Sequence, residues 1–313
     1  MKQNSTILAF RRVFFVIGFV ACGMMAYAQL PNEKFGKPSS MEWEFNGWGD
    51  AVNADAIILC KTMTATYQLS DQVFSNTQGS DFGFDNLQDF SKNEIDDSSI
   101  LINYEFRLRT KILKPEGVQH ANIDITYYDP DNNKSVSFDE LSDLKIRVFN
   151  KNEKGKVEKK NVNTASFVKE RVDANYVVVH VVVPEVQAGS IIEYQYNITS
   201  PRPTYLYDWV FQDCIPTVRS KCDIEIPAFL QFKMNAPINK LIKSSVEVGH
   251  IAYDTNRTDM KKGKTCATNH YKIIGDYILP TDEKIAVFTS QIISPKVTPP
   301  AEMPQGSTHL IVK

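Results

Sequence analysis

The sequence lacks any long run of basic residues, and this absence bears first on nucleic-acid binding. Its 313 residues include 35 basic and 37 acidic side chains, and basic residues adjoin only in pairs such as Lys159 with Lys160. Residues 29–313 alone carry 32 basic and 37 acidic side chains. Because nucleic-acid-binding domains need a basic footprint, we expect no nucleic-acid partner.

Cysteine is scarce, and its spacing argues against the common metal and redox motifs. After residue 28 the chain has cysteines at positions 60, 214, 222 and 266, none of them in a C-x-x-C pair. Cys214 and Cys222 are near enough to bridge a turn in an oxidising compartment. Cys222 also alternates with Asp223 and Glu225, which favours a small buried residue on a strand face. Both alternatives stay open.

Catalytic motifs are missing as well. Cys266 and His270 are the closest cysteine–histidine pair, but on a strand four residues span about 13 Å, too far for proton transfer. Ser190 follows Gly189 without forming a G-x-S-x-G elbow, and there is no H-E-x-x-H, P-loop or dinucleotide fingerprint. We therefore predict no catalytic residues, no cofactor and no metal site.

Three further features could carry ligand chemistry. Residues 129–133 offer calcium ligands but lack the glycine and distal glutamate of an EF-hand loop, and residues 81–85 form an aromatic loop that could contact a partner. His180 lies within a run of valines, and we expect it to be a hydrogen-bonded core residue. Acidic residues are numerous, so a carboxylate pair for glycoside hydrolysis remains open.

The N-terminus has the three-part layout of a secretory signal peptide over residues 1–28. Lys2, Arg11 and Arg12 precede an apolar stretch at 13–25, and Ala-Tyr-Ala follows at 26–28. The apolar stretch is short for a bilayer span, which needs about 20 residues. A retained membrane anchor or a buried core helix is the alternative.

Export to the periplasm or cell envelope is the expectation from this segment. The residues around Cys22 resemble a bacterial lipoprotein cleavage site, but Phe19 stands where leucine is usual. The apolar stretch continues past Cys22, so cleavage after Ala28 is favoured over lipid anchoring. No second long apolar stretch follows, so we expect no transmembrane segment after cleavage.

Residues 29–55 are predicted to form an N-terminal arm with a short helix. Ser39 and Glu42 have the spacing of a capping box, in which each side chain satisfies the other's backbone amide. Trp43, Phe45 and Trp48 follow, and we expect them to dock the arm on the body of the protein.

Beyond the arm the dominant period is two, which indicates β-strands. Residues 102–112 alternate between a largely apolar face and a strongly charged one, and residues 123–127 and 144–148 repeat the alternation. Residues 114–117 supply turn chemistry. The valine-rich run at 176–183 reads as a strand covered on both faces. It should form a central antiparallel hairpin with residues 191–198, because only a short turn separates them.

Further strands are expected at 205–212, 218–226, 231–234, 246–253, 265–274 and 285–293. Helical periodicity is scarce, and Ser137 with Glu140 could cap one more short helix. The fold class is therefore all-β, an antiparallel β-sandwich, single or doubled, with one or two short helices. We place this domain at 56–293 and a proline-rich tail or linker at 294–313.

Several segments resemble one known family. They are residues 184–196, 209–212 with Ile215 and Pro216, 224–227, and 35–39. Together they are similar to the domain of unknown function that precedes a transglutaminase-like core in many exported bacterial proteins. The resemblance implies an all-β domain whose motif residues are structural: Pro184, Gly189, Glu193, Tyr194, Trp209, Gln212, Pro216 and Pro227.

The longer relatives carry a Cys-His-Asp triad in the domain that follows. This chain stops at Lys313, so we expect a stand-alone or truncated form to which no catalytic residue is carried over. Read physically, Gly189 permits a turn with positive φ, and Pro184 ends a strand. Glu193 should pair with Arg107 or Arg109 on a neighbouring strand.

The leading functional hypothesis is a non-catalytic, exported envelope module that binds or presents a protein or a glycan. One alternative is an accessory or truncated part of a transglutaminase-like or cysteine-protease-like enzyme. A second alternative is a glycan-active enzyme that uses two carboxylates about 5–10 Å apart in an open cleft.

Overall fold

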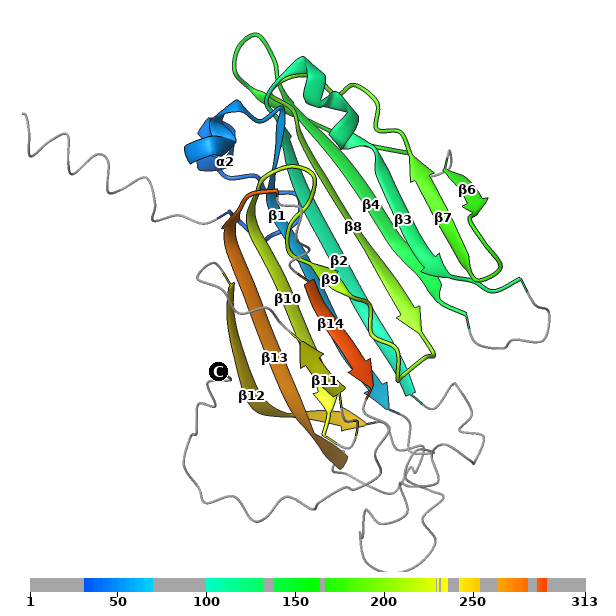
Figure 1. Ribbon diagram of the computed structural model, residues 1–313. Helices are drawn as coiled ribbons and strands as arrows, with labels where there is room; N and C mark the ends of the chain where they lie inside the picture. Colours follow the sequence, from blue (N-terminus) through cyan, green and yellow to red (C-terminus); the bar gives the residue numbers. More distant parts are fainter. Residues whose placement is uncertain are drawn as a thin grey trace, which may run out of the picture.

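The architecture is all-β, as the sequence predicts. The computed structural model describes residues 31–69, 100–131, 138–163, 167–228, 230, 232–235, 242–253, 264–280 and 286–291. The described residues form one eight-stranded sheet and two three-stranded sheets (Figure 1). The calcium-loop residues 132 and 133, the aromatic loop at 81–85, Ser137, Cys22 and the segments 1–28 and 294–313 lie outside the described residues.

The large sheet has the strand order β12-β13-β10-β1-β2-β8-β4-β5. Its strands are β1 (Ala56–Leu69), β2 (Ile100–Ile112), β4 (Glu140–Lys151), β5 (Val157–Asn161), β8 (Ile191–Ser200), β10 (Thr217–Pro227), β12 (Ile242–Tyr253) and β13 (Lys264–Ile278). All neighbours are antiparallel except β1 and β10, which run parallel. The sheet is therefore mixed at this one pair, where the sequence predicts antiparallel strands throughout. Only short hairpin connections dictate antiparallel pairing, and a long stretch of chain separates β1 from β10.

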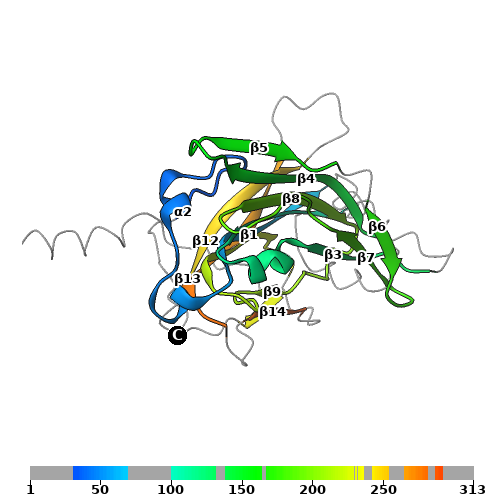
Figure 2. The ribbon, with the colours of Figure 1, turned by 90° about the horizontal axis from the view of Figure 1, so that it is seen from above.

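The two small sheets pack on one face of the large sheet, which we call the inner face (Figure 2). One contains β3 (Ile123–Tyr128), β7 (Tyr176–Val181) and β6 (Val168–Arg171); the other contains β11 (Phe232–Asn235), β14 (Ala286–Gln291) and β9 (Trp209–Val210). Ile123, Val179 and Trp209 from the small sheets share one buried cluster with Met63 and Tyr104 of the large sheet. This cluster is the core of a two-layer sandwich.

The expected hairpin between the valine-rich run and the next strand is wrong. β7 pairs with β3 and β6 in a small sheet, whereas β8 lies between β2 and β4 in the large sheet. Residues 182–190 therefore carry the chain from one layer to the other. Apolar runs that are adjacent in sequence look like hairpin partners, but the connection is long enough to cross between layers.

The helices are short: α2 (Ser40–Glu44) and the 3-10 helices η2 (Gly49–Asn53) and η4 (Pro115–Ala121). The capping box of Ser39 and Glu42 is confirmed, with both reciprocal hydrogen bonds formed. The turn expected at 114–117 is instead the start of η4, which leads to β3 in another sheet. The second helix expected near Glu140 is wrong, because Glu140 begins β4. Of the described helices, none is long and apolar enough to span a membrane.

The other face of the large sheet, which we call the outer face, differs between its two ends. Residues 31–55, the arm, cover one end, where Trp43, Phe45 and Trp48 pack against a second buried cluster that includes Ile57 and Phe149. The predicted docking role of these aromatic residues is confirmed. Toward the other end, outward-facing side chains such as those of Asn103 and Glu105 line an open groove.

Candidate functional site

A bulge in β1 sets up the covered end of the outer face. The register of β1 shifts between Ile58 and Cys60, which leaves Leu59 as an extra residue. Ile57 and Leu59, two residues apart, both contribute to the cluster beneath the arm, and because of the bulge the alternation after Leu59 continues in the opposite phase. The bulge therefore gives β1 an apolar outer surface where the arm docks and a polar one, with Thr62 and Thr64, beyond it.

Arg109 of β2 is the centre of a buried ion-pair network between the arm and the sheet. Its guanidinium donates to Glu42 of α2 at 2.5 Å and to Glu193 of β8 at 2.6 Å. It also donates to the backbone carbonyls of Asn32 at 2.6 Å and Lys34 at 2.7 Å. The side chains of Arg109 and both glutamates are at most 4% exposed. The predicted pairing of Glu193 with an arginine is confirmed.

Burial and charge act against each other in this network. Burial raises the pKa of Glu193 above its usual value, and Arg109 opposes this shift only in part. For Arg109, burial lowers the pKa but the two carboxylates outweigh it, so its pKa is raised. Arg109 is therefore a permanent cation that neutralises two buried acids only in part.

Gly36 connects the arm to the same network. Its backbone N–H donates to Glu193 at 2.5 Å, and its φ of +77° lies in the left-handed region. A Cβ at this position would lie 1.9 Å from the guanidinium of Arg147, whose planar group stacks 4.5 Å from the ring centroid of Phe35. Glycine suits position 36 because of this backbone conformation, and any larger residue would also displace the end of the Arg147 side chain.

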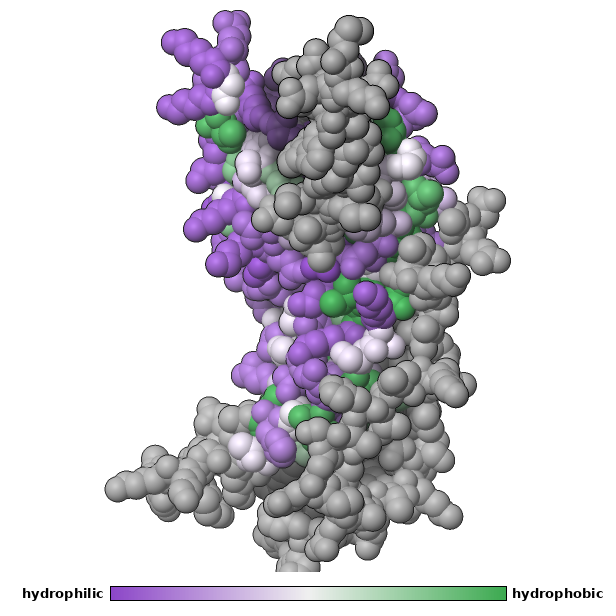
Figure 3. All heavy atoms as spheres, turned by 90° about the vertical axis from the view of Figure 1, so that its left-hand side faces the viewer, coloured by the Kyte–Doolittle hydropathy of each residue, from purple (hydrophilic) through white to green (hydrophobic). Residues whose placement is uncertain are grey.

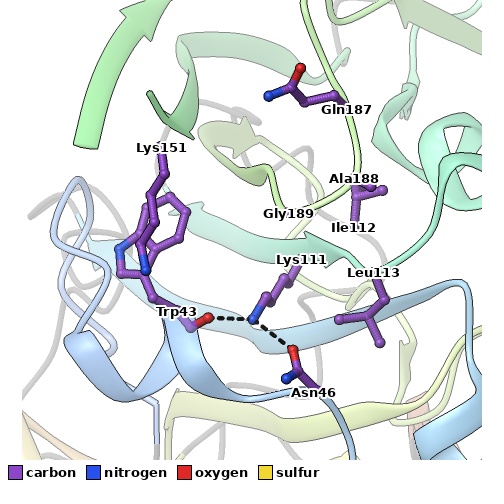
Figure 4. A pocket seen from close by; sticks show the side chains of 9 residues that line it. All are labelled: Trp43, Asn46, Lys111, Ile112, Leu113, Lys151, Gln187, Ala188 and Gly189. Carbon is purple, nitrogen blue, oxygen red and sulfur yellow. Dashed lines mark hydrogen bonds between the residues drawn. The ribbon is translucent and has the colours of Figure 1, made fainter. Parts of the chain in front are cut away.

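Lys111, two residues along β2, holds the C-terminal end of α2. Its ammonium donates to the carbonyls of Trp43 at 2.6 Å and Phe45 at 2.7 Å, and to the side-chain oxygen of Asn46 at 3.3 Å (Figure 4). Lys111 is 4% exposed, and burial lowers its pKa from 10.5 to about 8. A lysine thus supplies the donors that the last carbonyls of the helix need.

A cavity of about 210 Å³ opens beside Lys111, and we call it the arm pocket. Its walls come from the arm, β2, the end of β4 and the turn before β8: Trp43, Asn46, Lys111, Ile112, Leu113, Lys151, Gln187, Ala188 and Gly189 (Figure 4). Gly189 has a φ of +88°, which confirms its predicted role in the turn. The ammonium of Lys151 lies 5.1 Å from the ring centroid of Trp43.

The open end of the outer face contains a second concavity, the sheet groove, of about 320 Å³. It is lined by Thr64, Thr66, Asn103, Tyr104, Glu105, Ser142, Asn197 and Thr199, from β1, β2, β4 and β8. Its polar side chains hold one another across the strands: Thr199 donates to Asn103 at 3.1 Å, and Asn197 donates to Asp143 at 3.1 Å. The coloured part of the surface in Figure 3 is largely hydrophilic, with small separate hydrophobic patches.

Two carboxylates flank the β1 part of this groove. Glu105 and Asp223 are both register partners of Thr64, so their Cα atoms lie about 10 Å apart at the usual strand spacing. Both are already engaged in ion pairs: Glu105 contacts Arg107, and Asp223 contacts His270 and Lys221. This spacing joins Cα atoms and not the two carboxyl groups on which a two-carboxylate mechanism depends, and each acid already pairs with a basic side chain.

The remaining motif residues lie in different elements of the fold. Tyr194 is largely buried against the inner-face core, the indole N–H of Trp209 donates to Ser220 at 3.0 Å, and Gln212 is buried. The carbonyl of Pro216 accepts from Ile58 at 2.9 Å. Pro227 ends β10, and Pro184 lies in the connection between layers, three residues after β7 ends.

The structure also tests the predictions for the cysteines and for His180. Cys60, Cys214, Cys222 and Cys266 are all free thiols, so the bridge between Cys214 and Cys222 is absent, and Cys222 is a buried small residue in the core. The prediction that His180 is a core residue is wrong. Its side chain is partly exposed and contacts Asp124 at 2.7 Å.

Sequence reasoning missed one cysteine–histidine contact, between Cys214 Sγ and His120 Nδ1 at 3.9 Å. The two residues are far apart in the chain, so no local spacing signals their contact. Burial and Asp213 raise the pKa of the Cys214 thiol, which makes it a poor nucleophile. Among the described residues, no cluster of histidine, cysteine and acidic side chains has the geometry to hold a metal ion.

Comparison with known proteins bears on the identity of this domain. The family model described as "Domain of Unknown Function with solved-structure structure (DUF3857)" matches residues 101–262, more than half of the chain. The chain belongs to the DUF3857 family. DUF3857 is the domain found N-terminal to transglutaminase-like domains, so the family resemblance is confirmed. Most residues of the sheet groove and most of the arm pocket walls lie within the matched residues, whereas Thr64, Thr66, Trp43 and Asn46 precede them.

Other similarities of this DUF3857 chain are weaker. A crystal structure from Parabacteroides distasonis, described as a "putative protease", is 12% identical with a TM-score of 0.45. The match covers 76% of this chain and 41% of that protein, so the chain spans less than half of that protein's length. A likeness at this level carries no argument about activity. No curated protein matches the chain.

Proposed function

We propose that this chain is an exported, non-catalytic DUF3857 module that binds a glycan in the sheet groove. The observation that carries the proposal is the groove's lining of short hydroxyl and amide side chains on four adjacent strands. Export is supported by the signal-peptide layout of residues 1–28.

The chemistry of the groove suits a sugar better than a peptide. Thr64, Thr66 and Thr199 offer hydroxyl groups, and Asn103 and Asn197 offer amides, so the groove presents both donors and acceptors. A sugar ring presents hydroxyl groups that need both. A peptide usually anchors through apolar or aromatic side chains in pockets, and the groove's lining offers few apolar side chains.

The groove is also held in place before a ligand arrives. Its side chains stand on paired strands of the large sheet and are fixed by hydrogen bonds such as that from Thr199 to Asn103. A ligand therefore loses less free energy to ordering of the site than it would on a loop. This is what a non-catalytic recognition surface requires.

The proposal is tested by screening the chain against an array of bacterial envelope glycans. We expect retention of at least one glycan class, reduced about tenfold by Asn197→Ala or Thr66→Ala, since each removes a hydrogen-bonding group from the groove. Thr126→Ala is the matched control, because Thr126 is exposed on β3 of a small sheet. Absence of retention, or equal loss in the control, would refute glycan binding in the groove.

A second candidate function rests on the family alone. Because DUF3857 precedes transglutaminase-like domains, the chain could instead position a substrate for such a catalytic domain supplied by another chain. Adding the purified chain to such a domain should then raise its kcat/KM for an envelope protein. An unchanged kcat/KM would leave glycan binding as the better account.

Export has its own test. N-terminal sequencing of the protein recovered from the cell envelope should begin at Gln29, as cleavage after Ala28 predicts. A product that starts at Met1 and fractionates with the cytoplasm would contradict export.

A further inference from the structure

The arm pocket contains a buried positive charge without a carboxylate partner. The three hydrogen-bond partners of the Lys111 ammonium are neutral oxygens, from Trp43, Phe45 and Asn46. Among the described residues, no carboxylate lies within ion-pair distance of the Lys111 ammonium. Arg109 differs, because its guanidinium contacts two carboxylates. A cation buried in this way attracts an anion, because the low local dielectric strengthens the interaction.

A second ammonium stands on the opposite side of the same cavity. Lys151, the last residue of β4, contacts Glu44 at 3.3 Å, but the Glu44 side chain is 80% exposed. A solvated pair of this kind is weak, so Lys151 is free to exchange Glu44 for another anion. In Figure 4 Lys151 and Lys111 approach the cavity from different sides.

The remaining walls are apolar or backbone. The Trp43 ring and the side chains of Ile112 and Leu113 line the cavity next to the two lysines. On the far side the chain at Ala188 and Gly189 forms the wall, and a Cβ at Gly189 would meet no atom within 4 Å. The cavity thus combines positive charge with a flat aromatic surface and open space for a small molecule.

We propose that the arm pocket binds a small organic carboxylate, with its charged group between Lys151 and Lys111 and its apolar part against Trp43. The proposal goes beyond the sheet groove and does not depend on glycan binding there. An organic carboxylate fits better than a bare inorganic anion, because part of the wall is apolar and gains by covering a non-polar group. The volume suits a molecule of roughly the size of benzoate.

The experiment uses benzoate as the probe, with benzamide as its neutral counterpart of the same shape, in calorimetric titrations of the full chain at pH 7. We expect benzoate to bind at least about tenfold more tightly than benzamide, since only the carboxylate can accept a charge-assisted hydrogen bond from Lys151 and is attracted by the positive charge of Lys111. Equal affinity for the two compounds would overturn the proposal. Inorganic phosphate is the third probe, and phosphate binding without benzoate binding would overturn it too.

Lys151→Gln locates the site, and Lys154→Gln is its control on the adjacent turn between β4 and β5. We expect Lys151→Gln to weaken benzoate binding about fivefold, while Lys154→Gln leaves it unchanged. The Lys151 side chain is 38% exposed and pairs with the exposed Glu44, so this variant should fold. Equal binding by the two variants would place benzoate elsewhere and overturn the proposal.

A second measurement, the pH dependence of benzoate affinity, tests the role of the Lys111 charge. Benzoate should bind well at pH 7 and about tenfold more weakly at pH 9.5, because the pKa of Lys111 is about 8 and deprotonation removes its charge. The charged groups that face Lys111 are Glu44 on α2 and Lys151 on β4. The pH dependence should persist in Lys151→Gln; affinity that does not change with pH in either protein would exclude Lys111 from the site.

Discussion

The two ends of the outer face are built on the same strands but have opposite environments. On β2, Arg109 lies under the arm with a side chain 3% exposed, whereas the Glu105 side chain four residues away is 41% exposed. Both residues occupy the outward positions of one alternating pattern. The pattern therefore determines which side chains leave the core, and a separate segment determines which of them meet water.

The difference has an energetic consequence. At the open end each charge retains most of its hydration, so its ion pairs add little to stability. At the covered end the charges have lost their hydration and depend on their partners. Removing one partner there leaves an uncompensated buried charge, which costs several kcal/mol.

The largest expected effect tests this contrast directly. Arg109→Met leaves Glu42 and Glu193 buried without their cation, and we expect the free energy of unfolding to fall by about 3–5 kcal/mol. Urea denaturation at pH 7 measures the loss. Arg107→Met on the same strand is the control, because the Arg107 side chain is 33% exposed and reaches the arm only through a 3.4 Å hydrogen bond to the carbonyl of Glu33. Its expected cost is about 1 kcal/mol or less. Similar losses for the two variants would remove the contrast between the two ends.

The free energy of unfolding should depend on pH because folding lowers the pKa of Lys111. Its pKa falls from 10.5 to about 8 on folding, so between these values the unfolded chain holds a proton that the folded chain has released. Stability should therefore rise with pH across this window, by about 3 kcal/mol in all. The measurement is the difference between wild type and Lys111→Met, since other groups titrate in both. A difference that stays constant from pH 7 to 10.5 would contradict the prediction.

Alanine substitutions at two glycines with positive φ can distinguish the cost of backbone strain from the cost of a steric clash. Gly36→Ala meets the guanidinium of Arg147 under the arm, whereas a Cβ at Gly155, in the turn between β4 and β5, meets nothing within 4 Å. We expect thermal unfolding to show a cost of about 2 kcal/mol at Gly36 and about 1 kcal/mol at Gly155, the latter from the backbone alone. Equal costs would mean that the Arg147 side chain moves aside to make room for the new Cβ.

The smallest effect is expected at the open end. Glu105→Gln removes a partly exposed ion pair with Arg107, so the free energy of unfolding should change by less than about 0.5 kcal/mol. The same urea titration checks it. A loss of several kcal/mol would mean that the groove is a structural element rather than a free surface.

Local signals in the sequence predict local features well. Alternation locates most strands, the spacing of Ser39 and Glu42 predicts the helix cap, and the lone charge at Glu193 predicts its arginine partner. These features depend on residues a few positions apart, or on a charge that must be paired when it is buried.

Features that depend on distant parts of the chain are not predictable in this way. Glu42 caps α2 with one oxygen and holds Arg109 with the other, and only the first role has a local signal. The arm pocket brings together Trp43, Lys111 and Gly189, which are far apart in sequence. The partners of β7 and β8 depend on the layer into which residues 182–190 lead, and no periodicity encodes that choice.

The parallel pairing of β1 with β10 has a consequence for how the protein folds. One edge of β1 can pair with β2 early, but the other edge has no partner until residues 217–227 have been synthesised. Contacts of such long range are slow to form, and an unpaired edge in the middle of a future sheet favours aggregation. The pairing that closes the middle of the large sheet can therefore form only after more than two thirds of the chain has been synthesised.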